Sequence, residues 1–438
     1  MCIRDRAQEE SRRMLEKAQE DAKTIVSESE TIQRAQRRSS EIIHQAEDRS
    51  RQLYQVANTY TEDALRRTEE AIQAARAAYD ALSDQRKAQV SNYDVLLAAE
   101  ARLAELNAQD IYKTTGDFIV SKGAPVTGSI GGEWAVLGLA RSGRDVPGAD
   151  AYYASVVEYV QKAMDENGRL NRSRSTENSR LILALTAIGK DVTNVGGHDL
   201  LKGLDNMAYI QKQGINGPIF ALIALDSHNY PTSGDVTREK LVQVILDAAL
   251  ENGGWALSGT DADVDMTAMA IQALAPYYST NEAVKAAVDK ALDVLSNAQL
   301  PSGGFGSWGS ENSESCAQVI VALTALGIDP ASDSRFVKNG LTVLDALASY
   351  FVDGGGFRHV STSERDGMAT EQGYYALAAY YRFANAQTRL YDMTDVTVQT
   401  GGSNTPATGD TGVLGCIIAL PVTILAAAFV LKRKEREA

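Results

Sequence analysis

The chain has 438 residues, 44% of them hydrophobic, which allows two or three domains and a large apolar core. A formal net charge of -14, with no basic cluster between residues 112 and 392, excludes the phosphate-backbone contacts on which nucleic-acid binding depends. The three cysteines, Cys2, Cys316 and Cys416, are too few and too scattered for a disulfide framework.

Residues 1–68 predict one long coiled-coil helix. Small and apolar residues from Leu15 to Ala64 follow alternating steps of three and four, which makes a heptad seam. No Gly or Pro precedes Gly116, so nothing in the sequence breaks the helix. The seam residues are mostly small or polar, so we expect weak self-association. The segment resembles cytoplasmic coiled-coil proteins of the division-site scaffold or ATPase-stalk type.

A helical spacer is predicted over residues 69–110. Its sequence from Ala71 to Leu106 resembles short helical-hairpin modules of bacterial surface proteins. Upstream, Met1 to Arg6 resembles a translated sequencing-adapter end, and residues 1–30 lack the apolar core of an export signal. We therefore expect a chimeric or truncated reading frame, with a junction near residues 65–72.

Residues 112–392 repeat a glycine-rich turn, an aromatic or apolar residue and an alanine/leucine helix. The clearest copies are Gly131-Gly132-Glu133-Trp134, Gly253-Gly254-Trp255, Gly303-Gly304-Phe305 and Gly355-Gly356-Phe357, with weaker ones at Gly168-Arg169-Leu170 and Gly217-Pro218-Ile219. Helices such as Thr267–Leu274 are apolar on most faces and are predicted to be inner, whereas Glu282–Ala298 has a charged side and is predicted to be outer. Six copies predict an all-α fold, an α/α toroid of about six helical hairpins.

These repeats resemble the prenyltransferase/squalene-cyclase-type toroid repeats of Gram-positive cell-surface proteins. The segments that carry the resemblance are GSIGGEWAVLGLARSG, ENGGWALSG, DMTAMAIQALAPYY and GGGFRHV. The resemblance implies the toroid fold. It implies little about activity, because related toroids include terpene cyclases, zinc prenyltransferases, thioester proteins and cobalamin carriers.

Asp263 and Asp265 are the candidate catalytic residues. Crowded carboxylates raise one another's pKa, and a protonated one can donate to an alkene or epoxide. The stretch around them resembles the Asp-x-Asp-Asp-Thr acid motif of squalene-hopene-type cyclases, with Asp265 at the proton-donor position and Met266 where the last Asp would stand. The alternative is that these residues cap the inner helix, and we favour it.

A zinc site of the prenyltransferase type is not predicted. Glu314-Ser315-Cys316 imitates that family's Asp-x-Cys pair, but Ala369 stands at the third ligand position, and His359 lies in a turn. Neither a metal nor a cofactor is expected. Cys316 then reads as a small buried residue.

The polar starts of the inner helices are expected to converge at one end of the barrel. There, aromatic, acidic and amide side chains suit a sugar, a peptide or an amphipathic small molecule. The candidate ligand-binding residues are Trp134, Asn178, Trp255, Phe305, Trp308, Glu314, Phe357, Arg358 and Glu371.

The C-terminal residues predict a membrane or cell-wall anchor. A flexible linker over 393–411 contains Thr405-Pro406-Ala407-Thr408-Gly409, which resembles the Leu-Pro-x-Thr-Gly sorting pentapeptide with Thr in place of Leu. Residues 412–431 are uncharged and long enough to cross a bilayer, and the basic tail 432–438 is expected to stay cytoplasmic. The predicted partners are therefore the membrane, a sortase and the cell wall.

Together these features predict a surface-anchored toroid that binds a ligand at one pole. One alternative is a terpene-cyclase- or prenyltransferase-like enzyme that uses Asp265 as its acid. A second is a cytoplasmic coiled-coil scaffold, which would require the anchor to be misread. The sequence does not name the ligand.

Overall fold

The computed structural model describes residues 66–128, 130–307 and 309–399, together with isolated positions between 13 and 64. Most of the predicted coiled coil over 1–68, Trp308, the pentapeptide at 405–409, the predicted membrane helix at 412–431 and the tail at 432–438 lie outside the described residues. Within the described residues, no helix is both long and apolar enough to span a bilayer.

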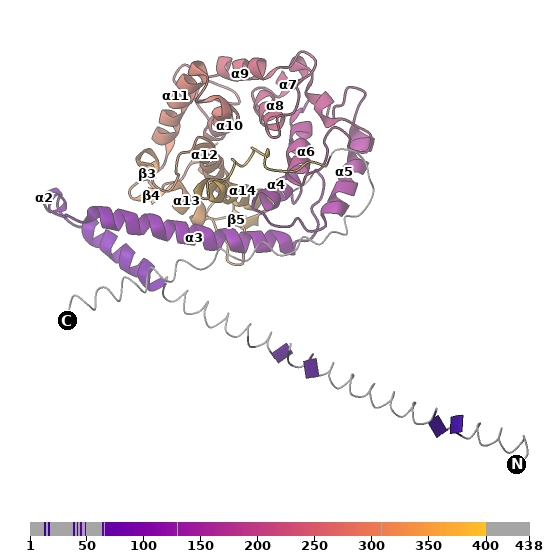
Figure 1. Cartoon of the computed structure of the whole chain (residues 1–438). Coiled ribbons are helices and arrows are strands. Elements are labelled where there is room, and N and C mark those ends of the chain that lie inside the picture. Colours follow the sequence, from indigo (N-terminus) through magenta and orange to yellow (C-terminus); the bar gives the residue numbers. More distant parts are fainter. Residues whose placement is uncertain are drawn as a thin grey trace, which may run out of the picture.

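Six inner helices of the described chain form a closed ring (Figure 1). Each contacts the next in chain order, and the last contacts the first, so the predicted toroid is confirmed. The inner helices are α4 (Glu133–Arg141), α6 (Thr176–Ala187), α8 (Asn216–Asp226), α10 (Val264–Leu274), α12 (Ser313–Ala325) and α14 (Gly367–Ala384).

The outer layer consists of helices of varied length and one irregular stretch. Its helices are α3 (Tyr93–Ser121), α5 (Ala149–Ala163), α9 (Arg238–Asp247), α11 (Glu282–Ala298) and α13 (Val343–Ser349). Between α6 and α8 the outer position is filled by η1 (Leu200–Leu204), α7 (Met207–Ile210) and η2 (Gln211–Gln213), and short turns η3 (Ala275–Tyr277) and η4 (Ser334–Phe336) follow later. Helix α3 contacts both α13 and α14, so an early element closes the ring against the last ones.

The predicted spacer is a helical hairpin that continues into the ring. Helical residues 66–80 and the short α2 (Asp84–Lys87) precede α3, which runs through the predicted boundary at 110–112. Arg76 joins the two arms, because its Nε donates to Glu100 at 2.7 Å and its guanidinium hydrogen-bonds the Tyr93 hydroxyl. Tyr79 stacks on Tyr93 with ring centroids 4.2 Å apart.

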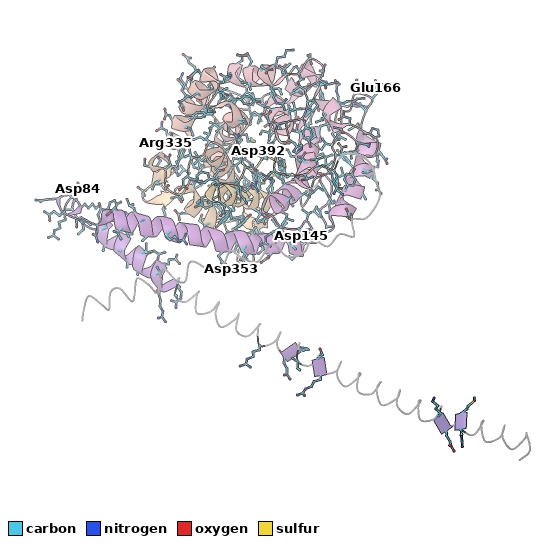
Figure 2. The ribbon with its side chains drawn as sticks, in the orientation of Figure 1. Asp84, Asp145, Glu166, Arg335, Asp353 and Asp392 are labelled. Atoms are coloured by element: carbon cyan, nitrogen blue, oxygen red, sulfur yellow. The ribbon has the colours of Figure 1, made fainter. Side chains whose placement is uncertain are left out.

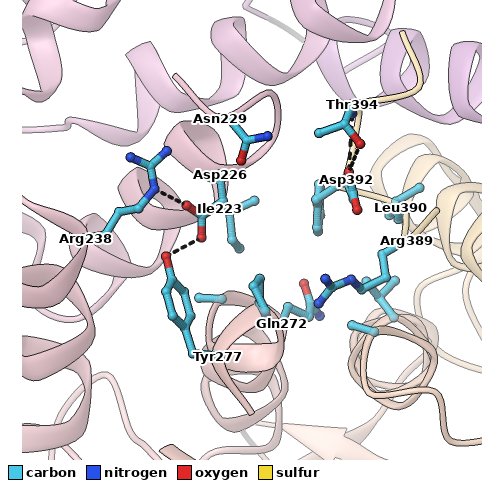
Figure 3. Close-up of a pocket in the computed structure, with 15 residues that line it drawn as sticks. Ile223, Asp226, Asn229, Arg238, Gln272, Tyr277, Arg389, Leu390, Asp392 and Thr394 are labelled. Atoms are coloured by element: carbon cyan, nitrogen blue, oxygen red, sulfur yellow. Dashed lines mark hydrogen bonds and ion pairs between the residues drawn. The ribbon is translucent and has the colours of Figure 1, made fainter. Parts of the chain in front are cut away.

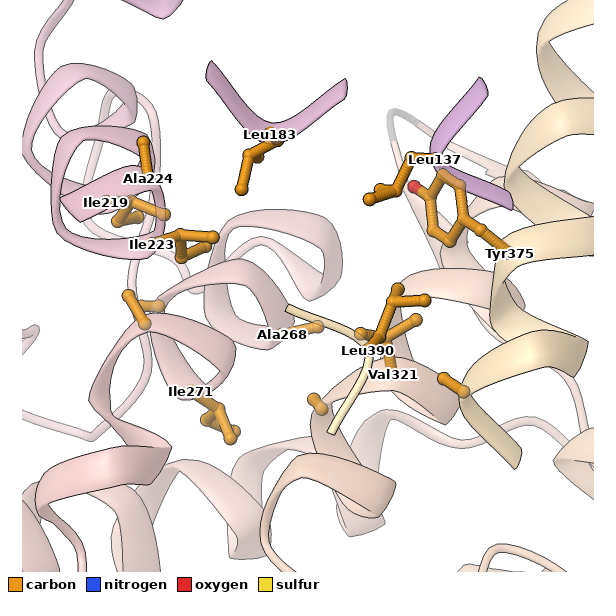
Figure 4. Close-up of a cluster of buried hydrophobic side chains, with 14 of the residues drawn as sticks. Leu137, Leu183, Ile219, Ile223, Ala224, Ala268, Ile271, Val321, Tyr375 and Leu390 are labelled. Atoms are coloured by element: carbon orange, nitrogen blue, oxygen red, sulfur yellow. The ribbon is translucent and has the colours of Figure 1, made fainter. Parts of the chain in front are cut away.

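Burial follows the predicted inner and outer patterns. Outer helix α11 buries one stripe, Val284, Val288, Ala291, Leu292 and Leu295, and leaves its charged side exposed. Inner helix α12 buries residues on all faces. The centre of the ring is filled by apolar side chains from several inner helices, among them Leu137, Leu183, Ile223 and Val321 (Figure 4). Charged residues such as Glu166 and Arg335 lie at the periphery (Figure 2).

The glycine-aromatic turns are tied to the inner helices by one recurring contact. The Thr267 hydroxyl accepts from the Trp255 backbone N–H at 3.0 Å, and the Thr370 hydroxyl accepts from the Phe357 N–H at 3.0 Å. Each threonine is the fourth residue of its helix. At Gly254 and Gly356 φ is +75° and +92°, and an added Cβ would lie 2.8 Å from the threonine oxygen. Two reasons therefore favour glycine at these positions: the positive φ, which other residues rarely adopt, and the lack of space for a Cβ atom.

Two-residue antiparallel strands accompany several turns. β1 (Gly306–Ser307) pairs with β2 (Ser310–Glu311), and β5 (Phe357–Arg358) pairs with β6 (Arg365–Asp366). These two hairpins directly precede α12 and α14. The third pair, β3 (Val337–Lys338) with β4 (Leu341–Thr342), precedes outer helix α13.

Two of the predicted turns belong to helices instead. Gly217 to Ile219 lie inside the first turn of α8, where the Gly217 Cα packs so closely on the Ile210 carbonyl that a Cβ would lie 1.8 Å from its oxygen. Trp134 is the second residue of α4 and not part of the turn before it. Its side chain therefore faces a different environment from that of Trp255.

The segment 386–399 lies over the end of the ring where the inner helices terminate. Two buried arginines hold it: Arg141 donates to the carbonyls of Leu390, Arg389 and Asp392 and pairs with Asp395 at 2.8 Å, and Arg382 pairs with Asp395 at 2.6 Å. Leu390 is 3% exposed and packs in the ring's centre. The first residues of the predicted flexible linker, 393–399, are thus part of the folded body.

We expect Thr370→Val to lower the free energy of unfolding by about 1–3 kcal/mol, because the buried Phe357 N–H loses its acceptor while side-chain volume is kept. Chemical denaturation of the full chain in detergent measures this change. Thr280→Val, at an exposed site after η3, is the control. Equal stability of the two variants would contradict the importance of the turn contact.

Arg141→Met should release the 386–399 segment, since the methionine keeps the apolar stem but loses all the donors to that segment. Hydrogen-deuterium exchange should then speed up at the Met393 and Gln399 amides, which donate to Ser227 and Gly189 carbonyls across the ring's end. The control is Arg144→Met, which removes a half-buried pair with Asp117. Unchanged protection at both amides would show that Arg141 does not hold the segment.

Candidate ligand site at the N-terminal pole

The first turns of the inner helices meet at one end of the ring, as the sequence predicts. Ser307, just before α12, donates to Asp263 at the start of α10 at 2.5 Å. Ser313, the first residue of α12, donates to the carbonyls of Arg358 and His359, which lie before α14. Glu371 in α14 accepts a short hydrogen bond from the Gly131 N–H, just before α4. We call this end the N-terminal pole.

Asp263 has a structural role at this pole. It is the N-cap of α10, and its carboxylate accepts from the Met266 N–H at 2.9 Å as well as from Ser307. Both oxygens are therefore occupied, which matches the capping alternative. Its oxygens are thus used in structural contacts, and the catalytic role considered for Asp263 stays a prediction.

Asp265 is the second residue of α10, and its carboxylate is less firmly held by hydrogen bonds than that of Asp263. Burial raises its pKa to about 6; the Asp263 and Glu314 charges add to the rise, and the Ser315 and Ser307 hydroxyls oppose it. The Ser315 hydroxyl therefore lies beside the Asp265 carboxylate, while no cation in the described chain pairs with that carboxylate.

A second acidic group lies across the pole. Glu371 is 6% exposed, and burial raises its pKa to about 7, with the nearby Glu133 charge adding to the rise and the Gly131 N–H opposing it. Glu133, also buried, accepts from the Gly128 N–H and lies 3.0 Å from Arg180 Nε. Arg180 pairs in turn with Glu177 at 2.8 Å. Arg180 therefore forms ion pairs with both Glu133 and Glu177. Among the described residues, Glu371 forms no ion pair with a cation.

Trp134 projects from α4 toward the ring's interior. Its ring lies 6.0 Å from that of Phe220 on α8 and 5.9 Å from that of Tyr375 on α14, and it stays partly exposed. Beneath it an amide ladder crosses three helices: Gln272 donates to Gln318, and Gln318 donates to Gln372 and to the Tyr375 hydroxyl. An aromatic surface over amides is what the sequence predicts for a ligand pole.

Several predicted ligand residues are inaccessible. Trp255, Phe305 and Phe357 are 0% exposed, and Trp255 Nε1 donates to the Ile245 carbonyl at 2.7 Å. Asn178 is also 0% exposed; it accepts from Leu170 and donates to the Gly168 and Leu200 carbonyls. These side chains pin turns to the wall of the ring, and no ligand reaches them in this conformation. Trp308 lies outside the described residues.

Glu314 and His359 form a pair at the edge of the pole, with His359 Nδ1 2.9 Å from the carboxylate. Arg358 is half-buried beside them, and its carbonyl accepts from Ser313. Cys316 is fully buried, burial raises its pKa to about 12, and its thiol lies against the Phe305 backbone. In the described part of the chain, no group of three or more His, Cys, Asp or Glu residues comes close enough to hold a metal ion.

Sequence reasoning placed Ser315 among the polar helix starts but missed Gln318, Phe220, Glu133 and Arg180. Ser315 and Gln318 are polar residues three apart in an otherwise apolar inner helix, and that spacing was a usable signal for one polar stripe facing the lumen. Phe220 carried no such signal, because α8 does not follow a glycine-aromatic turn. The pole as a whole offers two acids of raised pKa, Asp265 and Glu371, with an aromatic surface and amides, suited to hydrogen bonding of a neutral polar ligand.

Comparisons with known proteins add the following. No family model matches the chain. No curated protein matches it either. Among solved structures, it is similar to a Candida albicans protein geranylgeranyltransferase-I complexed with GGPP, with 16% identity and a TM-score of 0.43, over 64% of this chain and 93% of that one. A likeness this weak says nothing about what the chain binds or does.

Glu371 should make the ring less stable as pH rises. Its folded pKa of about 7 lies above the ordinary glutamate value of 4.5, so the folded state holds the proton more tightly and stability falls as pH rises between these values, by at most about 1.4 kcal/mol per pH unit. Glu371→Gln should flatten that slope, as measured by denaturation across pH. Glu282→Gln, exposed on α11, should keep it. A slope that survives Glu371→Gln would assign it to other groups.

Proposed function

We propose that the toroid is a binding module carried on the outer side of a membrane, and that its ligand binds at the N-terminal pole. The observation that carries this proposal is the largely buried carboxylate of Asp265, for which no cationic partner lies among the described residues. A buried carboxylate without a counter-charge costs free energy, so such a group marks a position where a ligand can supply the missing polar contacts. The partly exposed Trp134 lies at the same pole.

The chemistry of the pole favours a neutral glycan over the other ligand classes. Trp134 and Phe220 offer aromatic faces to the C–H groups of a sugar, and Gln372 offers an amide to its hydroxyls. Asp265, with a pKa of about 6, accepts hydrogen bonds above that pH and donates one below it. A peptide or an amphipathic small molecule would use the same groups.

Surface location is part of the same proposal. It rests on the sequence alone, on the sorting-like pentapeptide at 405–409 and the apolar stretch at 412–431, with the basic tail after them. A cytoplasmic scaffold built on the predicted coiled coil would follow if that stretch does not enter a membrane.

The enzyme alternative keeps Asp265 as the acid of a terpene-cyclase- or prenyltransferase-like reaction. Its raised pKa favours that role. The packing of the lumen opposes it, because Trp134, Phe220, Tyr375 and the apolar side chains below them occupy the ring's centre, where a long isoprenoid chain would have to lie. We therefore rank binding first.

Asp265→Asn should weaken glycan binding about tenfold or more, because a charge-assisted hydrogen bond contributes about 1.5–3 kcal/mol. Calorimetry of the full chain in detergent with chitohexaose and maltohexaose measures this effect. Asp261→Asn, at an exposed position in the same loop, is the matched control and should bind as the wild type does. Binding that Asp265→Asn leaves unchanged would remove the pole as the site.

The same proteins decide between binding and catalysis. They are incubated with squalene and with prenyl diphosphates, and products are sought by mass spectrometry. A product made by the wild type and by Asp261→Asn, but not by Asp265→Asn, would overturn the ranking and make Asp265 a catalytic acid.

A further inference from the structure

A cavity lies at the opposite end of the ring from the N-terminal pole. It has a volume of about 390 Å³ and lies between the C-terminal ends of α8, α10 and α12 on one side and residues 389–394 on the other (Figure 3). This volume falls within the range of small-molecule sites. Asp392, on its wall, lies over the middle of the ring (Figure 2).

One pair of charges in the cavity is already satisfied. Asp226 accepts from Arg238 Nε at 2.6 Å and from the Tyr277 hydroxyl at 2.8 Å. Arg238 also donates to the Leu225 and Tyr230 carbonyls, so it covers the electronegative end of α8. These groups fix one wall and have little left to offer a ligand.

A second pair of charges is open. The Arg389 guanidinium lines the cavity and makes no hydrogen bond or ion pair within residues 66–128, 130–307 and 309–399. Asp392 accepts from Thr394 through Oδ1, whereas its Oδ2 has no partner over the same stretch of chain. The two residues are not paired with each other, although both face the same space in Figure 3.

Gln272 adds an independent sign of a missing ligand. Its side chain is 5% exposed, and its Nε2 donates to the carbonyl and the side chain of Gln318. Its Oε1 is buried, lines the cavity and has no hydrogen-bond partner in the described chain. A buried acceptor without a donor calls for an N–H or O–H from a bound molecule.

The remaining wall is apolar. Ile223, Ala273, Val321 and Leu390 face the cavity, and the first three come from different inner helices. Within the described residues, the site therefore combines one unpaired cation, one carboxylate with an open oxygen, one buried acceptor and an apolar wall. A molecule that matches all four carries a carboxylate, an ammonium group and a compact apolar side chain.

We propose that this cavity binds a free apolar α-amino acid, with its carboxylate on Arg389 and its ammonium group on Gln272 Oε1 and Asp392. Guanidinium matches a carboxylate with two parallel hydrogen bonds, and a zwitterion adds no net charge to a cavity whose own charges balance. Two of the three polar contacts, Arg389 and Asp392, come from the 389–394 segment, so a bound amino acid also holds that segment on the ring. The site meets the amide ladder of the N-terminal pole only at Gln272, and neither proposal depends on the other.

The test is calorimetric titration of the full chain in detergent with L-phenylalanine and L-leucine. Phenethylamine, which lacks the carboxylate, and 3-phenylpropionate, which lacks the ammonium group, are the ligand controls. We expect both amino acids to bind and each control to bind at least about tenfold more weakly than phenylalanine, since each loses one charge-assisted contact. No binding of either amino acid up to about 10 mM would overturn the proposal.

Two variants separate the contacts. Arg389→Gln should make the protein bind phenylalanine and phenethylamine equally weakly, and Asp392→Asn should do the same for phenylalanine and 3-phenylpropionate. Arg86→Gln, exposed on α2 outside the ring, should bind phenylalanine as the wild type does. If each variant keeps the wild-type preference for phenylalanine over the control, the amino acid binds elsewhere and the assignment fails.

Discussion

The ring depends on a recurring hydrogen bond between a glycine-rich turn and the inner helix that follows it, which α6, α10 and α14 share. Thr267 and Thr370 accept from the backbone N–H of the aromatic residue in their turns, and Asn178 does the same for Leu170. In α12, Cys316 takes the equivalent place against Phe305. The contact sets how far each helix start lies from its turn, and the buried aromatic beside it fills the wall between neighbouring repeats. The turns also place the polar helix starts at one pole.

The toroid could be predicted because the sequence features that specify each repeat lie close together in the chain. Each repeat holds its turn, its aromatic residue and its helix within about fifty residues, and the apolar periodicity separates inner from outer helices. The contacts that close the body are of another kind. Arg141 binds a carbonyl 249 residues away, and α3 packs on α14 at the far end of the chain. Neither leaves a periodic trace in the sequence, so a flexible linker was predicted where residues 393–399 are docked.

The candidate site shows the same division. Asp265 and Trp134 were found from residue type and position, but the pattern could not say which aromatic residues face the lumen. Trp255 lies in the loop before α10, which begins at Val264, and is buried in the wall, whereas Trp134 is the second residue of α4 and reaches the interior. A side chain in a loop and one inside a helix point in unrelated directions, although both follow a Gly-Gly pair. The paired or open state of a carboxylate depends on neighbours from other helices, as the contrast between Asp263 and Asp265 shows.

Closure of the ring by α3 also bears on how the body comes apart. In a linear array of repeats each end repeat has one neighbour and can fray alone, so stability is a sum of local terms. Here α14 contacts α4, and α3 covers both α13 and α14, so every inner helix has a neighbour on each side. Removal of any one repeat breaks two interfaces at once. The closed topology therefore makes unfolding cooperative. The ring has no end repeat that could unfold first at a small cost in free energy.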